Sequence, residues 1–112
     1  MDSRKYRYNH MGIPTKTKQP NEKYIPAFRM YVSGYGENAF NIEWMRFEEG
    51  CQLPRIVQEL PHVAFEVDDL EAAIKGKEVI IQPNSPSDGI TVAFIVENGA
   101  PVELMEFGNK ED

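Results

Sequence analysis

One short pattern occurs twice in this chain, at residues 41–47 and 101–107, and it constrains the fold more than any other feature. Both copies carry Glu, Met and Phe at matching positions, with an apolar residue on either side of the first Glu. Side chains alternate between the two faces of a strand, so Glu43 and Glu103 each share a face with the Met and the Phe that follow. A carboxylate on an otherwise apolar face is unusual in a half-buried strand, and its repetition indicates a pocket.

The two histidines of the chain, His10 and His62, extend the repeat upstream, because each lies ahead of one copy of the Glu pattern. The spacing is 33 residues from His10 to Glu43 and 41 residues from His62 to Glu103. The second half is therefore longer by 8 residues, which is about two helical turns. The sequence predicts two equivalent halves, each opening with a His strand and closing with a Glu strand, with a helix after the first strand of the second half only.

In the first half, apolar alternation predicts strands at residues 5–13, 24–25, 28–32 and 40–48. Residues 15–22 contain only Thr, Lys, Gln, Pro, Asn and Glu and show no helical period, which predicts a loop. A linker over residues 49–60 follows. Its prolines bracket a short predicted helix whose Ile56, Val57 and Leu60 side chains face inward.

In the second half, we expect a strand at residues 61–67 and then a helix with Leu70, Ala73 and Ile74 as its apolar stripe. Asp68 is the expected N-cap of this helix, with Glu71 as its capping-box partner, and a glycine ends it. Further strands are predicted at residues 79–82 and 90–96, joined by a turn at residues 83–89. An Asn-Gly pair at residues 98–99 then predicts a tight hairpin into the second Glu strand.

Composition limits the classes of partner. A formal net charge of −6 over 112 residues argues against nucleic acid, because phosphate binding requires a surplus of Lys and Arg on one face. Cys51 is the single cysteine and has no internal disulfide partner, which fits the reducing cytoplasm. No apolar run approaches the roughly 20 residues of a membrane span, and no signal-peptide core follows Met1. We therefore expect a soluble cytoplasmic protein with no membrane or nucleic-acid partner.

Two His and two Glu at repeated positions predict a metal site. Neutral imidazole and carboxylate suit zinc, nickel, cobalt, manganese or ferrous iron, and the absence of a thiolate set argues against a Cys-type structural zinc site. If the halves pack about an approximate two-fold axis, their inner faces bring together His10, Glu43, His62 and Glu103. Because the chain has no other His, a Glu would have to move protons, and the sequence leaves open whether Glu43 or Glu103 is this catalytic base.

Three stretches resemble the vicinal oxygen chelate superfamily, which includes glyoxalase I, bleomycin-resistance proteins and extradiol dioxygenases. They are residues 10–13 (His-Met-Gly-Ile), 61–70 (Pro-His-Val-Ala-Phe-Glu-Val-Asp-Asp-Leu) and 101–106 (Pro-Val-Glu-Leu-Met-Glu), and the resemblance is strongest from His62 to Phe107. It implies an α+β fold in which two paired βαβββ modules form a curved mixed sheet, shaped as a cup around one divalent metal. The family's ligand positions fall on His10, Glu43, His62 and Glu103. Here the first module would lack its helix.

The resemblance implies a single glyoxalase-like domain over residues 1–112, with modules at about 4–48 and 61–107 joined by the linker 49–60. The two-His, two-Glu set is nearest to glyoxalase-like members, since the chain has no spare His for a dioxygenase. We therefore expect a metal-dependent isomerase or lyase that acts through a metal-bound enediolate on a small compound with vicinal oxygens. The alternatives are a non-catalytic protein that binds or sequesters a small molecule in the same cup, and a purely structural metal. Family precedent and an exposed outer sheet face also predict a homodimer.

Overall fold

The computed structural model describes residues 5–108, whose strands form one mixed eight-stranded sheet. The order across the sheet is β2-β3-β4-β1-β5-β8-β7-β6. Two short helices accompany it in the described part of the chain. The elements are β1 (Arg7–Pro14), β2 (Lys23–Ile25), β3 (Met30–Ser33), β4 (Ile42–Phe47), α1 (Arg55–Glu59), β5 (His62–Glu66), α2 (Leu70–Ile74), β6 (Glu78–Ser87), β7 (Ile90–Glu97) and β8 (Ala100–Phe107).

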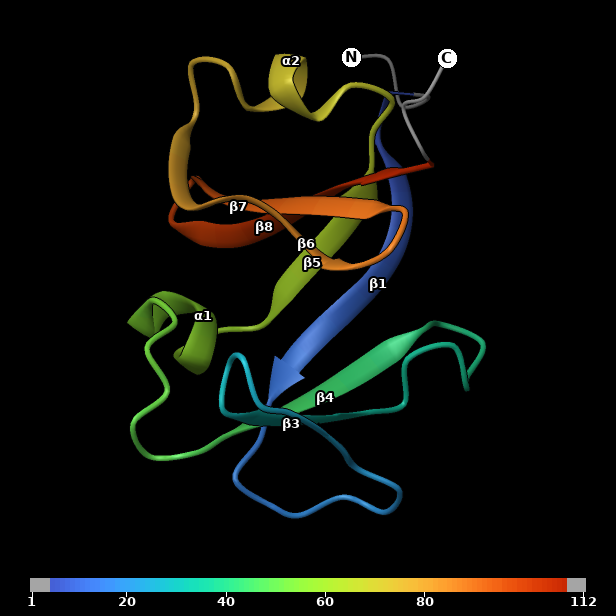
Figure 1. Cartoon of the computed structure of the whole chain (residues 1–112), viewed down its shortest axis with the longest axis vertical. Coiled ribbons are helices and arrows are strands. Elements are labelled where there is room, and N and C mark those ends of the chain that lie inside the picture. The colour runs from blue at the N-terminus through green and yellow to red at the C-terminus, as the bar shows by residue number, and fades with distance from the viewer. Residues whose placement is uncertain (1–4, 109–112) are drawn as a thin grey trace.

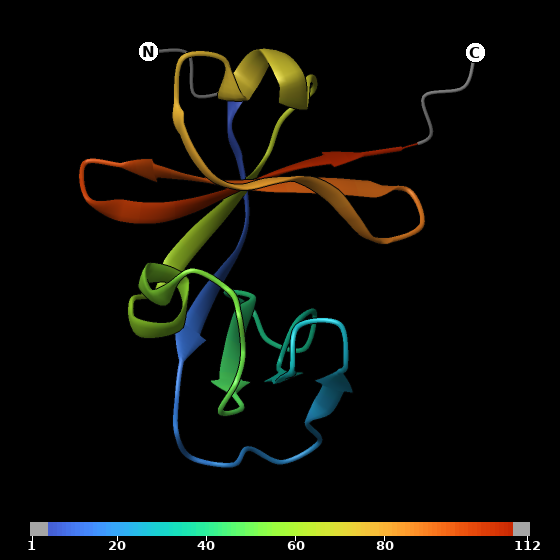
Figure 2. The same ribbon diagram turned by 60° about the vertical axis from the view of Figure 1, so that its left-hand side comes forward.

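The strand order is symmetric about the pair β1 and β5, which run antiparallel at the centre of the sheet. Each central strand has a parallel neighbour on its other side, β4 beside β1 and β8 beside β5. Figure 1 and Figure 2 show the β2–β4 half and the β6–β8 half lying apart, with β1 and β5 running between them. The expected α+β architecture of two paired modules in a curled sheet is confirmed, and the first module has no helix.

α2 covers the outer face of the second half. Its Leu70 packs with Ala93, Ile95 and Leu104 of the sheet, all of them buried. In Figure 1, α2 lies on the side of β7 and β8 that faces away from the first half. The inner face is the opposite one, and on it Ala64, Val92 and Met105 form a second buried cluster.

The missing helix has a measurable effect on the outer face of the first half. Trp44 and Leu104 occupy equivalent positions in the two Glu strands, yet Trp44 is 36% exposed and Leu104 only 2%. The homodimer expected from such an exposed face stays a prediction. The assignment of the chain to a single domain of two modules and a linker also stays a prediction. Residue 4, where the first module was expected to begin, lies outside the described residues. Neither helix within residues 5–108 has the length and apolarity to cross a membrane.

The expected turn at residues 83–89 is wrong, because β6 continues as a strand to Ser87. β6 is an edge strand, and its pairing with β7 shifts register at three places. An edge strand with bulges tolerates Pro83 and Pro86, since the missing N–H groups need no partner on the open side. Proline content therefore marked an edge strand and not a turn.

Two smaller expectations are also wrong. The N-cap of α2 is Asp69, whose side chain accepts a hydrogen bond from the backbone N–H of Ala72, while Asp68 forms an ion pair with Arg7. Leu60 does not face inward, and it is 42% exposed. The reason is that α1 ends at Glu59, after which the backbone of Leu60 is extended with φ −116° and ψ 148°.

The loop that replaces the first helix, residues 15–22, is fastened to the sheet by an ion pair. Arg46 on β4 donates to the Glu22 carboxylate from Nε at 2.7 Å and from Nη2 at 2.6 Å. The Gln19 backbone N–H donates to the same carboxylate at 3.0 Å. Arg46 also lies 4.2 Å from the centre of the Tyr31 ring, a cation–π distance. The hydrogen bonds from Arg46 lower the pKa of Glu22 from 4.5 to about 2.

We expect Glu22→Gln to lower stability at neutral pH. Because the folded pKa of Glu22 is depressed, its contribution is complete above the unfolded value of 4.5 and is lost as pH falls toward 2. Urea unfolding at pH 7 and at pH 3 measures this, and the difference between wild type and variant should shrink at the lower pH. Glu59→Gln, which removes an exposed ion pair with Arg55, is the control and should change little. An equal difference in stability between wild type and Glu22→Gln at both pH values would contradict the role given to the Glu22–Arg46 ion pair.

Candidate metal centre

Strand pairing brings the four expected ligand residues onto the inner face in two rows. Each row crosses three neighbouring strands and places a Gly or an Ala between a Glu and a His. The small residue leaves space above its strand, so that the two larger side chains can lean toward each other. The rows are Glu43–Gly12–His62 on β4, β1 and β5, and His10–Ala64–Glu103 on β1, β5 and β8.

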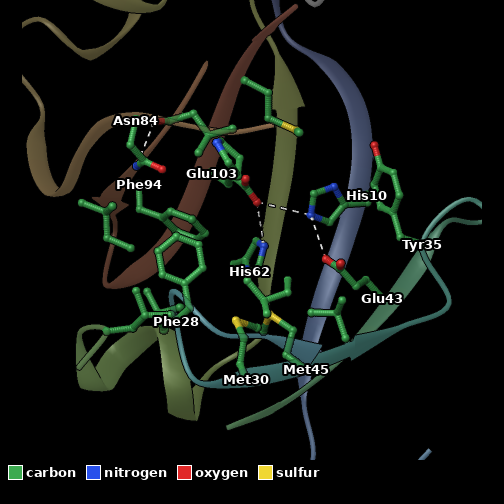
Figure 3. A pocket seen from close by; sticks show the side chains of 18 of the residues that line it. His10, Phe28, Met30, Tyr35, Glu43, Met45, His62, Asn84, Phe94 and Glu103 are labelled. Carbon is green, nitrogen blue, oxygen red and sulfur yellow. Dashed lines mark hydrogen bonds and ion pairs between the residues drawn. The ribbon is translucent and has the colours of Figure 1, made fainter. Parts of the chain in front are cut away.

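The four side chains meet at their polar atoms. Oε1 of Glu103 lies 3.0 Å from Nε2 of His62 and 3.3 Å from Nε2 of His10. Oε1 of Glu43 lies 3.5 Å from the same Nε2 of His10. Figure 3 shows these contacts as a chain from His62 through Glu103 and His10 to Glu43. His10, His62 and Glu103 are buried, and Glu43 is half-buried.

The donor set fits a divalent metal ion. Ligand atoms of His10, His62 and Glu103 all lie within 4.8 Å of one another. Nitrogen and oxygen ligands held at about 2.0–2.2 Å from one ion stand roughly 3.0–3.5 Å apart, and the two distances from Glu103 to the histidines, 3.0 and 3.3 Å, fall in this range. Glu43 stands outside this group of three but contacts His10. Two imidazoles and carboxylates are borderline ligands that suit zinc and its neighbours. The assignment of the individual ligands stays a prediction.

The two glutamates differ in their electrostatic surroundings. For Glu103, burial favours the neutral acid, but hydrogen bonds from His10 and His62 outweigh burial and lower its pKa. Burial is the largest influence on Glu43 and raises its pKa; the charge of His10 opposes this more than the charge of Glu103 adds to it, but the net shift is upward. Glu103 is therefore the carboxylate that stays charged, and Glu43 is the one that accepts a proton more readily.

The pKa of His10 is set by opposing effects. Burial is the largest single influence and lowers it, but the hydrogen bond to Glu103 and the charges of Glu103 and Glu43 together raise it. In the absence of a metal, the two carboxylates therefore favour the protonated form of the His10 imidazole. A bound metal would take over that role and displace the proton, since metal ligation requires neutral imidazole.

Asn9 is a residue of this centre that the sequence pattern did not reveal. Regular alternation would turn it away from His10, but the pairing of β1 with β5 shifts register between Tyr8 and His10. In this bulge, Oδ1 of Asn9 lies 2.7 Å from Nδ1 of His10 and accepts a hydrogen bond from the Tyr35 hydroxyl at 3.0 Å. Nδ2 of Asn9 donates to Glu66 at 3.0 Å. The amide orientation is thereby fixed, and Nδ1 of His10 must donate, which leaves Nε2 for the centre.

His62 is held differently. The residue before it is Pro61, which offers no side-chain acceptor, and Nδ1 of His62 is a buried atom without a hydrogen-bond partner among the described residues. Its ring is instead placed by packing against Gly12. A Cβ on residue 12 would overlap Cε1 of His62 and stand 2.9 Å from both ring nitrogens. Glycine in this strand is therefore required by the imidazole beside it.

The centre lies in a cavity of about 280 Å³ between the two halves. The first half contributes Met30, Val32 and Met45, and the second half contributes Ile81, Val92 and Phe94. The linker adds Leu53, and α1 adds Val57. The Phe94 ring meets the His62 ring edge-on, with 4.9 Å between centres. The arrangement offers a polar group of acids and imidazoles at one place in an otherwise apolar cavity, which is the usual organisation of a small-molecule site.

We expect Gly12→Ala to weaken metal binding at least about ten-fold, because the added methyl group forces the His62 ring out of place. Competition with a chromophoric chelator measures the affinity. Gly89→Ala is the matched control. Gly89 has a φ of +80° and open space around its Cβ position, so the control costs stability through backbone strain and leaves His62 untouched. Equal metal affinity in Gly12→Ala and wild type would contradict the role given to this glycine.

We expect Asn9→Leu to lower metal affinity by roughly 10- to 100-fold, since His10 loses the acceptor that fixes its tautomer. Tyr35→Phe is the control, because it removes a donor to Asn9 and leaves the Asn9–His10 bond in place. The same chelator competition serves for both variants. If the two variants bind metal equally well, the tautomer is not set by Asn9.

Comparison with known proteins supports the fold. No protein-family model matches the chain, and no curated protein matches its sequence. Among solved structures, a hypothetical protein from Bacillus halodurans C-125 matches with a TM-score of 0.67 and 19% identity over 96% of this chain and 98% of that one. The methylmalonyl-CoA epimerase from Mycobacterium tuberculosis matches with a TM-score of 0.57 and 15% identity over 93% of this chain and 89% of that one. The chain shares their fold, in agreement with the architecture that its resemblance to the vicinal oxygen chelate superfamily implies.

Proposed function

We propose that this chain is a metal-dependent isomerase or lyase of the glyoxalase type, acting on a small compound with two neighbouring oxygens. The observation that carries the proposal is the convergence of both histidines on one oxygen of Glu103, at 3.0 and 3.3 Å, inside an apolar cavity. The likeness in fold to a protein named as an epimerase supports it, because an epimerase is an isomerase.

His10, His62 and Glu103 would hold the divalent metal, and Glu43 is the expected fourth ligand. Such an ion supplies Lewis-acid polarisation of the bound oxygens, which makes a neighbouring C–H bond more acidic. The chain's own residues supply the rest. Asn9 keeps Nε2 of His10 directed at the centre, Gly12 gives the His62 ring its place, and the apolar walls exclude water.

Glu43 takes the role of the base in this proposal, and the difference between the two glutamates supports the choice. Glu103 is fixed by both imidazoles, so that a proton on it would break two contacts. Glu43 has one contact, to His10 at 3.5 Å, and burial raises its pKa toward the range useful for proton transfer at neutral pH. Its carboxylate also lines the cavity, where it can reach a substrate carbon.

The proposal is tested by deuterium uptake from D₂O into the carbinol carbon of hydroxyacetone and 2-hydroxyacetophenone, followed by NMR with the nickel- or zinc-loaded chain. We expect Glu43→Gln to lower the uptake rate by about 10²- to 10⁴-fold while the variant keeps its metal in elemental analysis. Glu103→Gln should lose the metal itself. Uptake no faster than that of Glu43→Gln with either compound would contradict an enzyme and favour a non-catalytic binding protein.

A further inference from the structure

We propose that the substrate of this centre is a neutral compound with an apolar body, such as an aryl or branched alkyl group, attached to its two oxygens. This inference rests on the proposed function and narrows its substrate class. It excludes substrates whose recognised part is a phosphate or a carboxylate, including coenzyme A thioesters held through their phosphates. Its basis is the distribution of charge and apolar surface over the cavity.

The ionisable side chains of the cavity lining are gathered at one place, and the other polar side chains of the lining, Tyr35, Asn84 and Ser87, are neutral. The ionisable ligand residues stand together on β1, β4, β5 and β8, as described above. The surrounding wall gathers aromatic and thioether side chains, and Figure 3 shows Phe28, Met30 and Phe94 beside His62 in this wall. A ligand with its oxygens at the centre would therefore have its remaining atoms against apolar groups. Burial of an apolar body against these side chains removes its surface from water, which favours binding.

No Lys or Arg of residues 5–108 contributes to the cavity lining. Arg29 is the nearest in sequence, between the lining residues Phe28 and Met30, but its side chain is 58% exposed and pairs with Glu48 at 3.9 Å. Arg46 points to the outer face and is held by Glu22. A phosphate or carboxylate inside the cavity would thus have no cationic side chain as a partner, and burial of an unpaired anion is strongly unfavourable.

Two neutral donors of the lining, on Tyr35 and Asn84, are also engaged. The Tyr35 hydroxyl donates to Asn9, and Nδ2 of Asn84 donates to the backbone oxygen of Gln82 at 2.9 Å. The two carboxylates of the centre add negative charge of their own. A divalent ion would balance Glu43 and Glu103 and leave no surplus positive charge for an anionic substrate. The neutral oxygens of a diketone or a hydroxyketone need no surplus positive charge for binding.

The volume of the cavity limits the size of the apolar group that the substrate can carry. A cavity of about 150 Å³ lined by aliphatic and aromatic side chains holds benzene, and the cavity here measures about 280 Å³. One ring or a branched alkyl chain together with two oxygens fills such a space. A glyoxal-sized molecule would leave the walls made by Phe94 and Ile81 uncovered.

A matched pair of probes tests the inference. 1-Phenylpropane-1,2-dione and benzoylformate have the same number of heavy atoms and the same phenyl-diketo skeleton, but only benzoylformate is an anion. Calorimetric titration of the full chain, stripped of metal with a chelator, measures both. We expect the dione to bind at least about ten-fold more tightly than benzoylformate, since the cavity offers the carboxylate no partner. Acetyl-coenzyme A should bind more weakly than the dione.

A charge introduced into the wall gives the second arm. Ile81 is half-buried and pairs with Phe94 across β6 and β7 on the cavity side. Ile81→Lys places an ammonium group there and should remove or reverse the preference for the dione. Ile81→Met has a similar length without the charge and should keep the preference.

The outcomes separate this inference from the proposed function. Equal or tighter binding of benzoylformate or acetyl-coenzyme A by the metal-free wild type overturns the inference, as does binding of none of the three at millimolar concentration. Neither result touches metal binding or deuterium uptake, which decide the proposed function. A clear preference for the dione in a chain that shows no uptake supports the inference and removes the enzymatic role.

Discussion

The antiparallel pairing of β1 with β5 is the interaction on which the rest of this structure depends. It joins the two halves, and its register alone sets His10 opposite Ala64 and His62 opposite Gly12. A shift of this register by one residue would place the two imidazoles on opposite faces of the sheet. The parallel neighbours β4 and β8 then bring their glutamates to the same small residues. The central register and those of its two parallel neighbours together determine the meeting of four side chains from four strands.

This pairing places ionisable side chains on the buried inner face of the sheet, where apolar side chains are usual. Glu103 is 8% exposed and both histidines are 3% exposed, so their mutual contacts offset a desolvation that would otherwise be unfavourable. Nδ1 of His62 remains buried without a hydrogen-bond partner within residues 5–108, and such an atom typically costs about 1–3 kcal/mol. Apolar side chains would serve stability better at these positions, which supports the proposed role of the buried polar group in binding a ligand.

Much of the fold follows from the sequence because it is a repeat. Glu43 and Glu103 recur with His10 and His62 at corresponding places, which is enough to predict paired modules. The polar composition of residues 15–22 predicts that the first module has a loop in place of a helix. The contributions of Asn9 and Gly12 could not be predicted in this way. Asn9 acts from a bulge that exists only once β1 meets β5, and Gly12 is explained only by the His62 ring on the next strand. Local alternation carries no information about either contact.

A sheet that curls partway and stays open to admit a ligand must keep two free edges, and here they are β2 and β6. Free edges invite the addition of strands from other molecules. β2 is limited to Lys23–Ile25, which is too short to serve as a template. β6 is long, but Pro83 and Pro86 together with three register shifts interrupt its row of backbone donors. The irregular geometry of β6 is thus unfavourable for the addition of a further strand, which disfavours fibrous self-association at this edge of the sheet.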